Sequence, residues 1–180
     1  MTGTTTPSRT GRGSRMRRLL HHACGALPSL AETLMGGLLW AACMAGSATL
    51  DLWFRRWETP GKVGAVAALF AAGGALGFPT GLFLARLIDR GKWAEARFAA
   101  AFLCLAMATI GSTAAIYVLV YRSYYATWHA DAFTVTWVFQ WIFTAAGALA
   151  QFAAFGLRLY VPAGFAALTL AALWFARKPR

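Results

Sequence analysis

The sequence predicts an all-α integral membrane protein, a bundle of about five transmembrane helices. Three observations support this prediction: 59% of the 180 residues are hydrophobic, only 13% are charged, and the charges avoid five long stretches of the chain. Typical soluble domains are about 45–50% apolar and about 25% charged, so the composition is unusual for a water-soluble globule. Extensive disorder is also excluded, because disordered segments combine low hydrophobicity with high charge.

The charge-free stretches correspond to the predicted spans. A helix needs about 20 apolar residues, with a range of about 17–25, to cross a hydrocarbon core ~30 Å thick. Uncharged runs of this length lack the polar alternation of membrane β-strands, so helices are the expected spanning elements. Together they form a single transmembrane domain over residues 30–177. The predicted spans are about 32–54, 63–86, 97–121, 132–157 and 159–176.

The first span is preceded by a basic tail, residues 1–29. Up to Arg18 the tail is rich in Thr, Ser, Gly and Arg and lacks acidic residues, so we expect it to be largely disordered. A short helix at the membrane interface is compatible with this prediction. Its cations are expected to attract anionic lipid headgroups by about 1 kcal/mol per charge. Lipid contact and topology thus account for the net charge of +11 without a nucleic-acid partner.

The second span carries a glycine stripe and a proline. Gly73, Gly77 and Gly81 recur every four residues and form one small-residue face, which lets a neighbouring helix approach closely. Pro79 removes the hydrogen bond to the carbonyl of Ala75, so we expect a kink or a short break. Transporters build substrate sites at broken helices, but a bent helix supported by its neighbours is the simpler interpretation.

The third and fourth spans are joined by an aromatic loop. Its tyrosines and tryptophans are typical of the interface between membrane and water. The loop also contains Arg122, His129 and Asp131, and a histidine near a carboxylate is suited to acid–base chemistry or metal binding. Neither a nucleophile nor further ligands accompany them. We therefore predict no enzyme, metal site or cofactor, and keep a catalytic site at His129 as the weaker hypothesis.

A polar stripe runs along the fourth span. Thr136, Gln140, Thr144, Gly147 and Gln151 are separated by three or four residues, so they share one helical face. Such a face either forms hydrogen bonds between helices, worth roughly 0.6–2 kcal/mol each, or lines a path for a polar solute. No ionisable residue joins the stripe, as proton-coupled transport would require. Packing is therefore the favoured interpretation.

The last span is the shortest. Residues 159–176 begin beside Arg158, and Pro162 lies where proline is tolerated, in a first helical turn. With five spans, ten Lys and Arg residues lie on the N-terminal side and seven on the other, which predicts a cytoplasmic N-terminus in a bacterial-type inner membrane. A four-span variant, in which this segment does not cross, changes the counts to thirteen and four.

These features predict a non-enzymatic inner-membrane protein that acts as an accessory, scaffold or assembly partner. Its expected partner is another membrane protein or a second copy of the chain. The alternative is a small transporter or channel for a polar solute or ion. It would use a helix broken at Pro79 and the face of Gln140 and Gln151.

Overall fold

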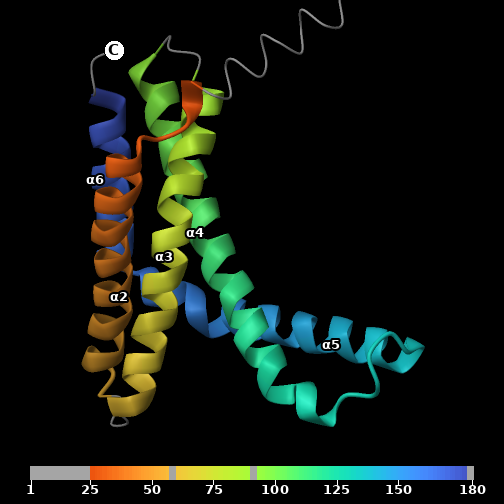
Figure 1. Ribbon diagram of the computed structural model, residues 1–180. Coiled ribbons are helices and arrows are strands. Elements are labelled where there is room, and N and C mark those ends of the chain that lie inside the picture. The colour runs from red at the N-terminus through yellow and green to blue at the C-terminus, as the bar shows by residue number, and fades with distance from the viewer. Residues whose placement is uncertain (1–24, 57–59, 90–92, 178–180) are drawn as a thin grey trace, which may run out of the picture.

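The computed structural model describes residues 25–56, 60–89 and 93–177 (Figure 1). Most of the basic tail therefore lies outside the described residues. The elements, all helical, are η1 (Glu32–Gly36), α2 (Gly37–Phe54), α3 (Pro60–Ile88), α4 (Ala94–Tyr125), η2 (Ala126–Trp128), α5 (Val135–Gln151), η3 (Phe152–Gly156), η4 (Leu157–Tyr160) and α6 (Ala163–Arg177).

Four described stretches are long and apolar enough to cross a membrane, and α6 is a shorter apolar helix. The predicted class, an all-α membrane bundle, is therefore confirmed. The four long stretches are Glu32–Phe54, Gly61–Ile88, Ala94–Trp128 and Val135–Tyr160.

The helices are not all aligned. In Figure 1, α2, α3, α4 and α6 run along the bundle, whereas α5 lies across its axis at one end. The last part of α4, the aromatic loop and α5 project sideways as an arm, residues 117–151. The sequence predicts a span over residues 132–157, and Val135–Tyr160 is long and apolar enough for one, but apolar length does not fix the direction of a helix. Packing against neighbouring helices and interfacial side chains sets it.

α6 is tied to the bundle at both of its ends. Near its start, the backbone N–H of Gly164 donates to Ser47 Oγ at 2.9 Å, and Ser47 Oγ donates to the carbonyl of Leu159 at 2.8 Å. At its far end, Arg97 Nη2 donates to the carbonyl of Phe175 at 3.0 Å, close to the start of α4. α6 therefore runs along the bundle and ends where α2 begins (Figure 1).

The glycine stripe of α3 packs directly on the backbone of α4. A Cβ atom added to Gly77 would lie 2.5 Å from the Cα atom of Thr109, and one added to Gly81 would lie 2.8 Å from the Cα atom of Leu105. α3 continues as one helix through Pro79, so it has no break there. The close fit on both sides of the proline supports the helix, as neighbouring helices do in membranes.

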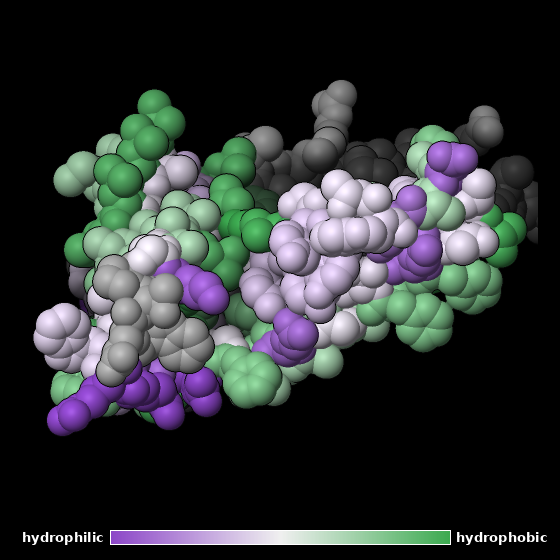
Figure 2. Space-filling view, turned by 90° about the horizontal axis from the view of Figure 1, so that it is seen from below, coloured by the Kyte–Doolittle hydropathy of each residue, from purple (hydrophilic) through white to green (hydrophobic). Residues whose placement is uncertain are grey.

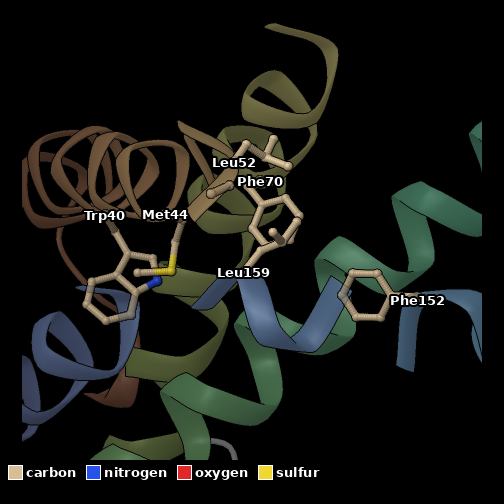
Figure 3. Packing of buried hydrophobic residues seen from close by; sticks show 7 residues of the cluster. Trp40, Met44, Leu52, Phe70, Phe152 and Leu159 are labelled. Atoms are coloured by element: carbon tan, nitrogen blue, oxygen red, sulfur yellow. The ribbon is translucent and has the colours of Figure 1, made fainter. Parts of the chain in front are cut away.

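Two apolar clusters and one polar cluster stabilise the bundle. Figure 3 shows the first apolar cluster, in which side chains from α2, α3, η3 and η4 pack together, namely Trp40, Met44, Leu52, Phe70, Phe152 and Leu159. The second consists of Leu82, Ala85, Ala101, Ala172 and Phe175. In the polar cluster, Trp40 Nε1 donates to Thr109 Oγ1 at 2.9 Å and Tyr160 Oη donates to Thr113 Oγ1 at 2.8 Å. These polar groups thus satisfy one another between helices.

Thr109→Val is expected to lower the free energy of unfolding by about 1 kcal/mol, because Trp40 Nε1 loses its buried acceptor. The matched control is Thr80→Val. The hydroxyl of Thr80 is exposed and bonds only to the carbonyl of Leu76 in its own helix. Denaturation by SDS in detergent micelles measures both variants, and equal losses of stability would contradict a role for the interhelical bond.

Candidate functional site

The turn before α5 fixes the start of the arm's outer helix. Thr134 Oγ1 accepts a hydrogen bond from the N–H of Trp137 at 3.1 Å, which is the usual geometry of a helix N-cap. The same hydroxyl donates to the carbonyl of Asp131 at 2.8 Å. Phe133 adopts a positive φ of 68°, so the chain reverses there. These contacts define the turn that connects the aromatic loop to the start of α5.

The polar stripe of α5 faces α4 and the loop. Gln140 Oε1 accepts from the N–H of Ala130 at 2.8 Å. Nearer the bundle, Gln151 Oε1 accepts from Tyr117 Oη at 2.9 Å, and Gln151 Nε2 donates to Tyr121 Oη at 3.4 Å. Both amides are therefore used in hydrogen bonds that hold the arm together.

The two threonines of the stripe differ in their contacts. Thr144 Oγ1 donates to the carbonyl of Gln140 at 2.6 Å and lies 3.3 Å from His129 Nε2. Thr136 is exposed. The stripe thus contacts the loop through its middle and α4 through its end at Gln151.

Arg122 lies between two tryptophans of α5. Its guanidinium carbon is 5.5 Å from the ring centroids of both Trp137 and Trp141. Such cation–π contacts are each worth about 0.5–2 kcal/mol, more where water is excluded. Within the described residues, Arg122 Nε and His129 Nδ1 are shielded from solvent and have no hydrogen-bond partner. These two atoms are unsatisfied groups in an otherwise hydrogen-bonded arm.

The three candidate catalytic residues have different contacts. Arg122 stacks on tryptophans, His129 approaches Thr144, and Asp131 is exposed. In the described part of the chain, no ion pair joins Asp131 to either of the others. Within those same residues, no group of three His, Cys, Asp or Glu side chains is placed to hold a metal ion.

Large apolar side chains beside the polar stripe of α5 are exposed. Phe139 is 57% exposed and Phe143 is 71% exposed, and Ala148 is the one buried residue of the helix. Of the bundle helices, α5 packs mainly on α4. Figure 2 shows the arm extending away from the bundle, with hydrophobic residues along one edge beside a paler, more polar surface.

A groove lies where the arm joins the bundle, beside Tyr117 and Gln151 at the two ends of the arm. It has a volume of about 470 Å³ and is lined largely by apolar side chains, chiefly Val66, Leu69, Phe70, Phe152, Phe155 and Leu159. Lys62 and Arg158 also line it, and both are exposed. They are far apart in the sequence, and the crosswise position of α5 brings them to one groove. Nothing in the sequence indicates this pairing.

No protein-family model, curated protein or solved structure matches the chain. The chain is a multi-pass membrane protein by its apolar helices.

Proposed function

We propose that the protein is a non-enzymatic accessory subunit that assembles with another membrane protein through its arm. The observation that carries this proposal is the arm itself. It extends from the bundle, and the glutamines of its polar stripe form hydrogen bonds within the arm. Large apolar side chains such as Phe139 and Phe143 are exposed on it. A hydrogen-bonded projection with exposed aromatic side chains is suited to contact with a second protein.

The unsatisfied groups of the arm favour a protein over plain lipid as its neighbour. Arg122 Nε and His129 Nδ1 are shielded and lack partners among the described residues. Hydrocarbon offers no hydrogen-bond acceptors, whereas a second protein offers backbone carbonyls and carboxylates. Because both atoms are shielded, a partner bonds them only if side chains of the arm rotate on binding, a change that is common at interfaces.

The contacts inside the bundle favour an accessory role over transport. A transporter built on Pro79 needs a broken helix, and α3 is continuous there. A solute path along the glutamines needs a free polar face, but Gln140 and Gln151 are bonded to the loop and to α4. Asp131 is exposed and, within the described residues, forms no ion pair with Arg122 or His129, which favours a non-enzymatic role.

We further propose that both ends of the transmembrane domain lie in the cytoplasm of a cell with a bacterial-type inner membrane. If α5 does not cross, twelve of the 17 Lys and Arg residues lie on the side where α2 begins and α6 ends. This distribution of Lys and Arg is more uneven than the ten against seven of the five-span topology. α6 has only 15 residues, and a short span is accommodated by local thinning of the bilayer. The five cations of the other side are Arg55, Arg56, Lys62, Arg122 and Arg158.

Site-specific photo-crosslinking in the native host tests the docking role. A photoreactive amino acid replaces Phe139 or Phe143 in the arm, and Met107 of α4, which is 70% exposed, is the control. We expect one adduct of discrete mass from both arm positions and none from Met107. Gln140→Leu combined with Gln151→Leu, which removes bonds that hold the arm, is expected to reduce the adduct several-fold.

Two outcomes would contradict the proposal. The first is an absence of protein adducts at both arm positions, and the second is an equal adduct at Met107. An adduct of twice the chain mass would identify a second copy as the occupant in place of a different membrane protein. Expression and detergent extraction of each variant are compared with those of the unmodified protein, so that loss of folding is recognised.

A further inference from the structure

The groove between the arm and the bundle combines apolar walls with two cations. Its volume of about 470 Å³ lies within the range of about 300–1,000 Å³ that is typical of small-molecule sites. We propose that the groove binds one anionic phospholipid. An acyl chain lies along the apolar wall, and the phosphate lies against Lys62 and Arg158.

The apolar wall comes from three parts of the chain that only the fold brings together. α3 contributes Val66 and Phe70, the end of α2 contributes Leu52, and η3 contributes Phe152 and Phe155. A surface of this composition is complementary to a hydrocarbon chain, and the bilayer supplies such chains at high concentration. Within a membrane, the groove therefore has an acyl chain as its natural occupant.

Within the described residues, no acidic side chain is paired with the cations of the groove. The guanidinium carbon of Arg158 is 5.5 Å from the ring centroid of Phe155, which also lines the groove, so the charge is held beside the apolar wall. Among the described residues, neither Lys62 nor Arg158 forms an ion pair. Arginine and lysine are the usual ligands of phosphate groups.

A third cation at the same end of the bundle is engaged differently. Arg55 Nε lies 2.8 Å from Asp51 Oδ2, and this hydrogen bond raises the pKa of Arg55. Its charge is therefore balanced within α2. Arg55 thus differs from Lys62 and Arg158, for which no ion pair is found within the described residues.

The position of the groove distinguishes this lipid from lipids that the basic tail attracts. The groove lies beside Leu52 near the end of α2, and the tail joins the chain before Glu32 at the start of that helical stretch. These are opposite ends of the bundle (Figure 1). Figure 2, which looks onto the groove end, shows hydrophilic patches beside apolar surface between the bundle and the arm. The bound lipid therefore belongs to the leaflet opposite the tail.

The test measures lipid retained by the full-length protein. The protein is reconstituted with equal amounts of phosphatidylglycerol and phosphatidylcholine, extracted in mild detergent and analysed by native mass spectrometry. We expect one retained phosphatidylglycerol per protein. Lys62→Gln combined with Arg158→Gln is expected to reduce its retention about tenfold relative to phosphatidylcholine.

The control for charge is Arg55→Gln combined with Arg56→Gln, which removes two cations from the same end outside the groove. It is expected to retain phosphatidylglycerol as the unmodified protein does. Equal loss in both double variants, or no preference for phosphatidylglycerol in the unmodified protein, would overturn the proposal.

A second pair of variants tests the apolar wall. Ala65 lines the groove, and Ala68 is exposed on α3 outside it. Ala65→Trp is expected to abolish retention of the lipid by filling the groove, whereas Ala68→Trp leaves retention unchanged. Retention of the lipid by Ala65→Trp at the level of Ala68→Trp would place the lipid elsewhere and overturn the proposal.

Discussion

Gly77→Leu is expected to destabilise the bundle by about 3 kcal/mol, at the upper end of the usual range for overpacking. A Cβ atom at Gly77 would lie 2.5 Å from the Cα atom of Thr109 and 2.9 Å from its backbone nitrogen. These are backbone atoms of α4, which cannot rotate aside as a side chain does. The two helices must therefore separate, and the neighbouring contact between Trp40 Nε1 and Thr109 Oγ1 is strained with them.

Gly111→Leu is the matched control for this effect. Gly111 lies within α4, and a Cβ atom added there meets nothing within 4 Å, so we expect a change of no more than about 0.5 kcal/mol. Unfolding in SDS titration, followed by tryptophan fluorescence, compares the two variants with the unmodified protein. Similar midpoints for Gly77→Leu and Gly111→Leu would show that the glycine stripe is not a helix contact.

The glycine stripe illustrates what local spacing can predict. Gly73, Gly77 and Gly81 lie four residues apart, and that spacing alone identifies a face for close approach. The sequence did not identify which helix would occupy the face, because small residues occur throughout this Ala- and Gly-rich chain. The continuity of α3 at Pro79 also depends on that neighbour, since proline disturbs an isolated helix more than a supported one.

The direction of α5 illustrates what spacing cannot predict. Residues 132–157 are as free of charge as the other spans, and composition measures only whether a segment tolerates hydrocarbon. The bonds from Gln140 to the loop and from Gln151 to α4 hold the helix across the bundle. The polar stripe was visible in the sequence, but its partners lie in other elements.

The candidate sites also depend on contacts that residue spacing does not predict. Arg122, His129 and Asp131 are close in the sequence, yet Arg122 lies in the last turn of α4 against tryptophans of α5, His129 lies near Thr144, and Asp131 is exposed. Lys62 and Arg158 are far apart in the sequence, yet both line one groove. Proximity along the chain is a weak guide to a site that is formed by a loop and a crosswise helix.

The side of the membrane reached by each segment after α4 follows from the direction of α5. If α5 lies along the membrane, a topology reporter fused after Arg158 stays on the extracytoplasmic side, and one fused after Arg180 returns to the cytoplasm. If α5 crosses the membrane, both readings are inverted. A reporter fused after Arg56 is extracytoplasmic in either case and calibrates the assay, because it follows only the first span.

The most direct measurement is the pair of reporter fusions after Arg158 and Arg180, read with an enzyme active only outside the cytoplasm and a fluorescent protein active only inside it. We predict extracytoplasmic enzyme activity after Arg158 and cytoplasmic fluorescence after Arg180. Cytoplasmic fluorescence after Arg158 together with extracytoplasmic activity after Arg180 would show that α5 crosses the membrane, and would contradict the arm and the groove beside it.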